Sequence, residues 1–386
     1  MPSYSAREQA AHDPAPRPFD TLDLHPALAR GIADLGFKET RPVQSAVLPY
    51  ALAGNDVIAC AETGTGKTGA FVLPILQQLL IDADAEGGTL SAGTRALVLA
   101  PTRELAVQIE DTIQGLLYHT NATSAAVYGG VPMDPQDRAL RAGVHIVVAT
   151  PGRLMDHMRS AVPDFSKLEV LVLDEADRMM DMGFWPDVQR IVSELPAKRQ
   201  TLLFSATMPD DMMRLTAAIV HEPKYIDLGR SGGPARTITH TIEAVEARDK
   251  PQWLAAFLRK ADGPTLVFTR TKHGAEKLAR QLQGLGVRAA AIHGDRTQEQ
   301  RMAAVEGFRG GRHKVLVATD IAARGLDIEG ITHVINYEVP TSPEAYVHRV
   351  GRTGRDLTTG TALTLVAPEE LRALRALEKS VGVQLQ

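Results

Sequence analysis

The sequence predicts an α/β protein with two doubly wound parallel sheets in tandem. Short runs of β-branched and apolar residues alternate with helical stretches along all 386 residues, which is typical of parallel sheets. Similar runs recur in the same order on both sides of a turn-rich stretch at 229–237, which we interpret as a linker. The length suits two or three domains of ordinary size.

Two pairs of segments carry this internal repetition. The run at 96–100 corresponds to the run at 265–268, and 146–150 corresponds to 315–319. We therefore expect a flexible N-terminal extension at 1–18, a first domain at 19–228 and a second domain at 238–386.

Composition excludes several classes of protein. The chain is 44% hydrophobic and 23% charged, as in soluble globular proteins. It has no apolar run of membrane-spanning length and no secretory signal. Its one cysteine, Cys60, excludes an internal disulfide and a cysteine-based zinc cluster. A cytoplasmic protein is the expectation.

Charge differs in sign between the two halves. Residues 1–228 contain 19 Lys and Arg against 29 Asp and Glu, whereas residues 229–386 contain 23 against 17. The basic second half can attract polyanions. The excess is modest, so nucleic-acid binding should depend more on a shaped cleft than on bulk charge.

A phosphate-binding loop is predicted at residues 61–68, which read AETGTGKT. Gly64 and Gly66 allow backbone amides to turn toward phosphate oxygens. Lys67 adds a cation for the β- and γ-phosphates, and the Thr68 hydroxyl can ligate Mg²⁺. A short apolar strand precedes the loop and a helix start follows it at 69–73, which argues against a plain Gly/Thr-rich surface turn.

Two acidic residues, Asp174 and Glu175, follow an apolar run at 170–173. That position is the carboxyl edge of a parallel sheet, where such sheets bind ligands. Asp174 would hold Mg²⁺, largely through water, and Glu175 would polarise the attacking water. An acidic helix N-terminus is the alternative for this pair alone. With the phosphate loop, the pair indicates binding and hydrolysis of a nucleoside triphosphate.

The second half has no phosphate loop and instead carries HRVGRTGR at residues 348–355. Arg349, Arg352 and Arg355 are spaced three apart and would fall roughly on one face of a helix. A solvated basic face is one interpretation. The other is arginine fingers that reach the triphosphate across an interdomain cleft, which the phosphate loop elsewhere in the chain favours.

In order and spacing, these motifs resemble those of the DEAD-box ATP-dependent RNA helicases, most of all the bacterial RhlE-type group. The similarity runs from about Phe19 to about Val366. It implies two RecA-like domains, ATP and Mg²⁺ as cofactors, and single-stranded or short duplex RNA, bound with little sequence specificity, as partner. It leaves protein partners open.

The resemblance also implies a role for each matching residue on the nucleotide side. Phe37 would stack on adenine and Gln44 would hydrogen-bond its edge, since an amide offers both donor and acceptor. The residues placed around ATP are Phe19, Phe37, Gln44, Thr63, Gly64, Thr65, Gly66, Lys67, Thr68 and Asp327. Those expected to be catalytic are Lys67, Asp174, Glu175, Arg352 and Arg355, and those expected to couple hydrolysis to unwinding are Asp177, Ser205, Thr207, His348 and Arg349.

RNA contacts are implied in both domains. In the first they are Pro101, Thr102, Arg103, Gly130, Thr150, Gly152 and Arg153. In the second they are Thr269, Arg270, Gly294, Asp295, Thr319 and Arg324. Such residues bind phosphates and sugars, which carry no base sequence, and contacts to 2′-hydroxyls favour RNA over DNA. Aromatic residues make up only 5% of the chain, so no base-stacking array is expected.

The sequence departs from the family pattern at a few positions. Thr40-Arg41-Pro42 stands where the family usually has Pro-Thr-Pro, and Asp356 follows the last motif in place of alanine. No long basic or glycine-rich tail follows Leu385, so the sequence is either a minimal core or part of a longer protein.

The expected mechanism is closure of the two domains by ATP and single-stranded RNA together, with cooperative binding. Closure would complete the catalytic site and bend the bound strand, so that base pairs of a short duplex open. The alternatives are an ATP-gated RNA clamp with slow turnover, a DNA helicase of the same superfamily, and a metabolic kinase, in which the arginine-rich second half has no obvious role.

Overall fold

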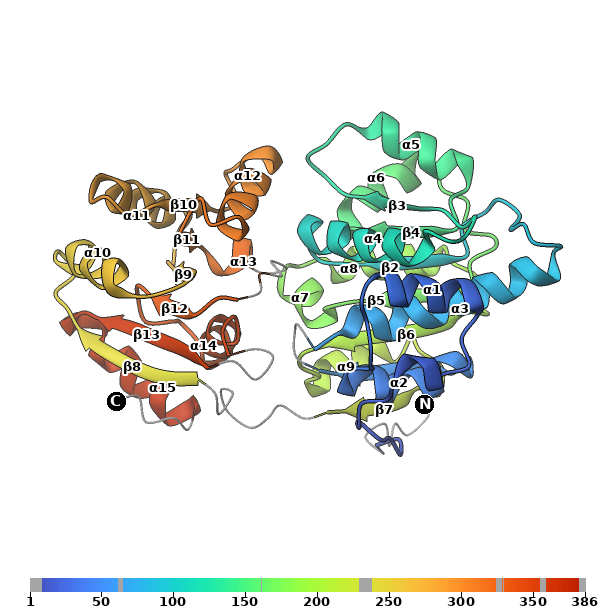
Figure 1. Ribbon diagram of the computed structural model, residues 1–386, viewed down its shortest axis with the longest axis horizontal. Helices are drawn as coiled ribbons and strands as arrows, with labels where there is room; N and C mark the ends of the chain where they lie inside the picture. The colour runs from blue at the N-terminus through green and yellow to red at the C-terminus, as the bar shows by residue number, and fades with distance from the viewer. Residues whose placement is uncertain are drawn as a thin grey trace. The chain divides into compact units, whose positions relative to one another are not determined.

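The structure is a computed structural model that describes residues 9–61, 65–160, 162–228, 238–323, 328, 330–354 and 359–381. The chain divides into two compact units, Met1–Arg230 and Ser231–Gln386. Within each unit, helices cover both faces of one parallel sheet (Figure 1). The stretch 229–237, expected as a linker, lies outside the described residues.

The first unit is built on a seven-stranded sheet in the order β3-β4-β2-β5-β6-β1-β7. Every neighbouring pair of strands is parallel. The strands are β1 (Val57–Cys60), β2 (Ala96–Leu99), β3 (Ser124–Val127), β4 (Ile146–Ala149), β5 (Val170–Leu173), β6 (Gln200–Ser205) and β7 (Lys224–Asp227).

The helical elements of this unit are η1 (Phe19–Thr21), α1 (Pro26–Asp34), α2 (Pro42–Leu52), α3 (Lys67–Ala85), α4 (Arg103–Leu117), α5 (Met133–Ala142), α6 (Pro151–Arg159), α7 (Ala176–Asp181), α8 (Trp185–Ser193) and α9 (Asp210–Thr216). Helix α3 begins two residues before the start expected from the sequence.

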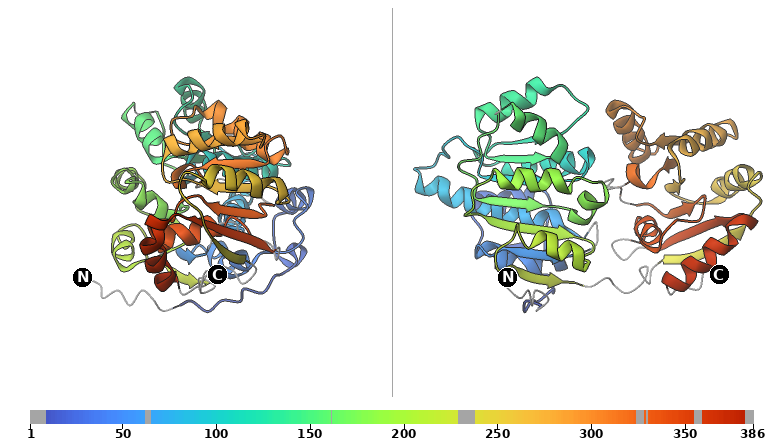
Figure 2. Two further views of the ribbon diagram at one scale, coloured as in Figure 1. Left: turned by 90° about the vertical axis from the view of Figure 1, so that its left-hand side faces the viewer. Right: turned by 180° about the vertical axis from the view of Figure 1, so that it is seen from behind.

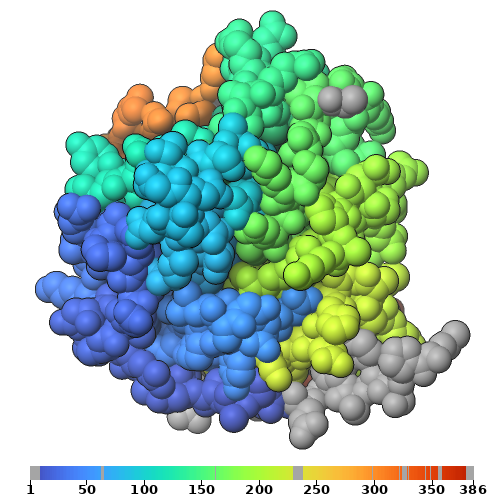
Figure 3. Space-filling view, turned by 90° about the vertical axis from the view of Figure 1, so that its right-hand side faces the viewer, coloured from blue at the N-terminus to red at the C-terminus, as the bar shows by residue number. Residues whose placement is uncertain are grey.

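Alternate residues of each strand face two different cores, because side chains of a strand point to opposite faces in turn. Val57 and Ala59 pack with α1 to α4, and Ile58 packs with α5 to α9. Burial on both faces explains the unbroken apolar runs of the central strands. Figure 3 shows the face where α1 and α2 lie beside α3, and Figure 2 shows from behind the green helices of the opposite face.

The second unit has a six-stranded sheet in the order β10-β11-β9-β12-β13-β8, again all parallel. Its strands are β8 (Ile238–Ala244), β9 (Thr265–Phe268), β10 (Ala289–Ile292), β11 (Val315–Ala318), β12 (His333–Asn336) and β13 (Gly360–Val366). Its helical elements are α10 (Lys250–Lys260), α11 (Lys272–Gly284), α12 (Gln298–Arg309), α13 (Asp320–Ala323), α14 (Pro343–Val350), η2 (Pro368–Glu370) and α15 (Leu371–Val381).

The two sheets share one topology. Numbered from its own first strand, the second sheet has the order 3-4-2-5-6-1, which the first sheet also follows before adding β7 at its edge. The segments matched by sequence are equivalent in this scheme, β2 with β9 and β4 with β11. The prediction of two doubly wound α/β folds in tandem is confirmed.

Equivalent threonines begin equivalent helices in the two units. Thr102 Oγ1 accepts a hydrogen bond from the amide of Leu105 at 3.3 Å at the start of α4. Thr271 Oγ1 accepts from the amide of Gly274 at 3.0 Å at the start of α11. Such caps satisfy amides that have no partner within the helix. Among the described residues, no helix has the length and apolar character needed to cross a membrane.

Candidate functional site

Most of the predicted first-domain residues meet at one edge of the first sheet. Strand β1 leads into the phosphate loop, β5 leads into Asp174-Glu175, and β6 ends at Ser205. Strands β5, β6 and β1 are neighbours, so their carboxyl ends bring these three segments together. Pro101 and Thr150 follow β2 and β4 at the same edge.

The phosphate loop ends at the N-terminus of α3. Lys67, the first residue of the helix, is 5% exposed, and its Nζ donates to the carbonyl oxygen of Ala61 at 3.2 Å. Gly66 before it has φ 89° and ψ 22°, a left-handed conformation that glycine adopts without steric cost. The first amides of a 19-residue helix therefore start at the loop, where they favour a bound anion. Thr65 and Thr68 beside them are partly exposed.

Gln44 and Arg41 pack against this loop. Gln44 Nε2 donates to the carbonyl oxygen of Gly66 at 2.9 Å, and its Oε1 accepts from the amide of Arg41 at 2.9 Å. A Cβ on Gly66 would lie 2.6 Å from Arg41 Cδ and 2.9 Å from Gln44 Nε2. Arg41, which departs from the family pattern, therefore covers Gly66, so a side chain here would have to displace Arg41 and Gln44 and would also be strained by the φ angle.

The two predicted aromatic contacts differ in exposure. Phe37 is 46% exposed, so its ring is accessible for stacking. Phe19 is 7% exposed and belongs to the hydrophobic core. Its amide donates to the carbonyl oxygen of Lys38 at 3.1 Å, which joins it to the backbone beside Phe37.

Asp174 and Glu175 are 2% and 3% exposed. Burial raises the pKa of Asp174 to about 6, although the charge of Lys67 acts in the opposite direction. Asp174 Oδ1 accepts from the amide of Glu175 at 2.9 Å. Glu175 has φ 52° and ψ 50°, which is uncommon for a residue other than glycine. Both carboxylates are thus held in a buried site near a lysine.

Asp177, Ser205 and Thr207 are joined by hydrogen bonds. Asp177 Oδ2 accepts from the amide and from the hydroxyl of Thr207 at 3.1 and 3.2 Å. Ser205 Oγ accepts from the amide of Asp177 at 3.3 Å and donates to the carbonyl oxygen of Thr207 at 2.6 Å. A change in the position of α7 would therefore move the segment after β6.

Two predicted RNA-contacting arginines converge on the turn at residues 129–131. A Cβ on Gly130 would overlap the guanidinium of Arg103, and Gly130 has φ 85°. Arg153 Nη1 donates to the carbonyl oxygen of Val131 at 3.0 Å. Gly152 has no atom within 4 Å of the place where a Cβ would stand. Pro101, Thr102 and Thr150 are buried, so their side chains are less accessible than those of the arginines.

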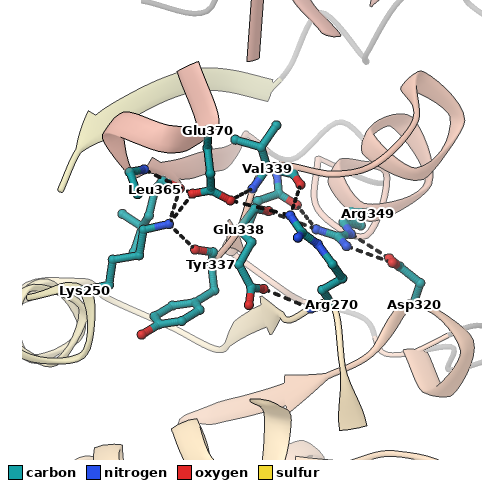
Figure 4. Close-up of polar contacts among 11 residues, drawn as sticks. Lys250, Arg270, Asp320, Tyr337, Glu338, Val339, Arg349, Leu365 and Glu370 are labelled. Atoms are coloured by element: carbon teal, nitrogen blue, oxygen red, sulfur yellow. Dashed lines mark hydrogen bonds and ion pairs between the residues drawn. The ribbon is translucent and has the colours of Figure 1, made fainter. Parts of the chain in front are cut away.

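The predicted RNA contacts of the second unit follow β9, β10 and β11. The Arg270 side chain is 53% exposed, and its Nη2 lies 3.6 Å from Glu370 Oε1 (Figure 4). Asp295 is also exposed, and its Oδ1 accepts from Lys272 Nζ at 2.8 Å. Gly294 is exposed, whereas Thr269 and Thr319 are buried.

Arg349 is 3% exposed and is bound inside the second unit (Figure 4). Its Nε and Nη2 donate to the two carboxylate oxygens of Asp320 at 2.6 and 2.8 Å, and its Nη1 donates to Asn336 Oδ1 at 3.1 Å. The guanidinium carbon lies 5.2 Å from the ring centroid of Phe268. Arg349 thus joins α14 to the ends of β9, β11 and β12, and its coupling role toward the DEAD segment stays a prediction.

Arg349 and Arg352 do not lie on one helix. Helix α14 ends at Val350, and Arg352 lies in the turn that follows, 5% exposed. Thr353 Oγ1 donates to the carbonyl oxygen of Ile331 at 2.5 Å, and Gly354 has φ 69°, so the chain leaves the helix here. The described part of the chain does not include Thr63, Gly64, Arg324, Asp327, Arg355 or the side chain of His348.

Sequence reasoning missed several residues that hold the site. Arg178 forms a buried ion pair with Glu175, and only its spacing of three residues from Glu175 could have indicated this. Glu338 and Glu370 bind the amide and the guanidinium of Arg270. Gln136 Oε1 lies 3.4 Å from Arg153 Nη1. No short motif marks these last three, because their partners are distant in sequence.

Family models match both units. The model described as DEAD/DEAH box helicase matches residues 41–215, and the model described as helicase conserved C-terminal domain matches residues 249–356. Together they span most of the described residues of the two sheets.

Curated relatives carry related names. The chain is 42% identical over 369 residues to the ATP-dependent RNA helicase CshA of Listeria monocytogenes, covering 95% of this chain and 69% of that protein. It is 41% identical over 382 residues to the ATP-dependent RNA helicase DeaD of Mycobacterium tuberculosis, covering 98% of this chain and 65% of that protein. The more specific expectation of an RhlE-type protein stays a prediction.

Solved structures are similar over nearly the whole chain. Saccharomyces cerevisiae Dbp5 bound to RNA and ADP BeF3 has a TM-score of 0.85 at 31% identity, covering 96% of this chain and 95% of that one. Mss116p bound to single-stranded RNA and AMP-PNP has a TM-score of 0.85 at 28% identity, covering 96% and 79%. On the evidence of both domain models and these relatives, the chain belongs to the DEAD/DEAH box helicase family.

Proposed function

We propose that this chain hydrolyses ATP when RNA is bound and uses that cycle to open short RNA duplexes. The observation that carries the proposal is the cluster at the carboxyl edge of the first sheet. There Lys67 at a helix N-terminus, the buried Asp174-Glu175 pair and the Asp177–Thr207 hydrogen bonds follow neighbouring strands of the sheet. The names of the relatives and the RNA and nucleotide analogues in similar structures support the same activity.

Each part of this cluster has a distinct chemical task. The amides at the start of α3 and the Lys67 ammonium bind the phosphates. Glu175 accepts the proton of the attacking water, as a general base does. The hydrogen bonds that join Asp177 to Ser205 and Thr207 couple the nucleotide-bound state of this site to the position of the segment after β6. Phe37 and Gln44 contact the adenine.

The oxygen ligands at this edge fit Mg²⁺. Mg²⁺ prefers carboxylate and hydroxyl oxygens and keeps several waters, so one or two carboxylates together with phosphates suffice to bind it. In the described residues, no group of three or more His, Cys, Asp or Glu could hold a metal by itself, which agrees with a site shared with the nucleotide. Asp174 and Thr68 would hold the ion, which supplies positive charge to the phosphates. Its positive charge would also offset the free energy cost of burying the ionised Asp174 carboxylate.

RNA binding involves the strand ends of both units. Arg103 and Arg153 are partly exposed and Arg270 is exposed, and their guanidinium groups would bind phosphates without base preference. ATP and RNA stabilise one closed arrangement of the two domains, in which Arg352 and Arg355 reach the γ-phosphate and the bound strand bends. Such linkage makes the two ligands bind cooperatively. We place this activity in the cytoplasm.

The test is ATP hydrolysis with and without a single-stranded oligouridine, for the wild type and for Glu175→Gln. We expect strong stimulation by RNA that is lost in the variant, because the amide cannot accept the proton. A rate of ATP hydrolysis that does not change when RNA is added would contradict the proposal, and so would a Glu175→Gln variant as active as the wild type. Slow phosphate release with long residence on RNA would instead support the RNA clamp.

A further inference from the structure

The two carboxylate oxygens of Glu175 have different surroundings. Oε2 lies 2.5 Å from Arg178 Nη1, and the two side chains are 3% and 4% exposed. Oε1 is also buried but has no hydrogen-bond partner among the residues that the structure describes. A buried carboxylate oxygen without a hydrogen-bond partner costs folding free energy, so a role in packing does not explain a glutamate at this position.

The backbone of Glu175 is fixed from both sides. Its amide donates to Asp174 Oδ1, and Asp177, two residues later, is bonded to Ser205 and Thr207. Its left-handed conformation, with φ 52°, costs on the order of 1–3 kcal/mol and persists only where surroundings impose it. With the backbone fixed, the direction of the carboxylate depends on what its side chain binds.

Arg178 supplies that contact from the next turn of the chain. It lies on α7, and Glu175, three residues earlier, immediately precedes that helix; the two side chains form an ion pair. Its own amide donates to Asp177 Oδ1 at 3.0 Å. The guanidinium is always charged and presents its donors in a rigid plane. The hydrogen bond between the two side chains joins one nitrogen to one carboxylate oxygen, which leaves the second oxygen for another group.

We propose that Arg178 is a positioning residue that holds Oε2 of Glu175 so that Oε1 faces the attacking water. The inference rests on the proposed function, in which Glu175 is the general base. The water proton passes to Oε1 while the bond from the water oxygen to the γ-phosphorus forms. The bond from that phosphorus to the β,γ-bridging oxygen breaks, and its electron pair leaves with ADP. Arg178 takes no proton in this step.

The experiment compares kcat and KM for ATP at saturating single-stranded oligouridine. Arg178→Met keeps the length of the side chain and removes its charge. We expect kcat to fall about 100-fold, the size of effect that a misplaced catalytic group produces, while KM for ATP changes by less than about threefold. Arg178→Lys restores a cation and should recover part of kcat. The matched control is Arg190→Met, since Arg190 also follows an acid, Asp187, by three residues but is 66% exposed.

Two further measurements separate the possible failures. In a Glu175→Gln background, Arg178→Met should cause no additional loss of kcat, because the group that it positions is gone. An equal loss in both backgrounds would overturn the inference, as would wild-type kcat in both Arg178 variants. If Glu175→Gln alone is as active as the wild type, the proposed function is wrong, because Glu175 is then not the general base. Thermal unfolding and binding of a fluorescent ATP analogue show whether each variant is folded. If Arg178→Met is unfolded, the Arg178→Lys pair in the two backgrounds decides the question alone.

Discussion

Replacing Lys250 by methionine should selectively destabilise the second unit. Lys250 begins α10 and is 3% exposed. Its Nζ donates to the carbonyl oxygens of Tyr337 and Leu365 at 2.9 and 3.0 Å and to Glu370 Oε2 at 2.6 Å (Figure 4). Glu370 Oε1 accepts from the amide of Val339 at 3.1 Å. This ammonium therefore ties α10 to β13, to η2 and to the end of β12.

The magnitude depends on the groups that the substitution leaves without a partner. Methionine fills a similar volume, so little cavity forms. Two carbonyl oxygens lose their donor, and the Glu370 carboxylate, 14% exposed, loses the nearer of its two cations, since Arg270 Nη2 remains 3.6 Å from its Oε1. Breaking a buried ion pair from one side costs about 3–5 kcal/mol. Because Glu370 keeps some contact with water, we expect about 3 kcal/mol.

Tryptophan fluorescence can report this unit alone. The chain has two tryptophans, Trp185 in the first unit and Trp253 on α10. Trp253 is stacked on Phe257 with ring centroids 5.6 Å apart. In a Trp185→Phe background, urea unfolding followed by Trp253 gives the free energy of the second unit from its midpoint and slope. The control is Lys260→Met, at the exposed end of the same helix, which should change that free energy by no more than about 0.5 kcal/mol.

Equal midpoints for Lys250→Met and Lys260→Met would refute the reasoning. The double variant Lys250→Met with Glu370→Leu is a second check. It removes both charges together, so it should recover part of the lost stability, since apolar replacements of a whole buried pair are often neutral or stabilising. A double variant less stable than Lys250→Met would mean that Glu370 acts through other contacts.

Two other predictions concern the phosphate loop and the stability of the second unit in acid. Gly66→Ala should weaken binding of a fluorescent ATP analogue at least tenfold, because its Cβ would displace Arg41 and Gln44. The control is Gly54→Ala, at φ 76° with no atom within 4 Å of its Cβ, which should cost about 1 kcal/mol of stability but leave binding unchanged. Equal affinities of the two variants for the analogue would contradict this prediction. Hydrogen bonds from His293 and Arg296 lower the pKa of Glu276 to about 2. The pKa of Glu276 is lower in the folded chain than in the unfolded chain, where it is about 4.3. The ionised Glu276 carboxylate therefore stabilises the fold fully above about pH 4.3, and this stabilisation is lost as the pH falls toward about 2. Glu276→Gln should therefore flatten the acid unfolding curve followed by Trp253, and an unchanged curve would count against the assignment.

The sequence indicated the sheets and the strand-end sites for one physical reason. Strands buried on both faces need unbroken apolar runs, and a parallel sheet gathers the residues after those runs at one edge. Asp174 and Ser205 are far apart in sequence, yet both could be placed at that edge from this rule.

Side-chain partners could not be derived in the same way. The contact between Arg349 and Asp320 depends on how β11 and α14 approach each other, which no local pattern encodes. Two other contacts also depend on how distant segments approach each other: Arg41 covers Gly66, and the Phe19 side chain packs in the hydrophobic core. The spacing of three places arginines on one face only within a helix, and Gly351, which favours a helix end, stands between Arg349 and Arg352.

The shared strand order places two lysines in equivalent positions. Lys67 is the first residue of the helix after β1, and Lys250 is the first residue of the helix after β8, the corresponding strand. In the second unit the chain supplies the anion itself, as the carboxylate of Glu370, and the three donors of the Lys250 ammonium are used inside the fold. The second unit thus carries a permanent internal counterion for its lysine, whereas the Lys67 ammonium of the first unit contacts the carbonyl oxygen of Ala61. We therefore expect an exchangeable anion such as phosphate to bind at the helix of the first unit and not at that of the second.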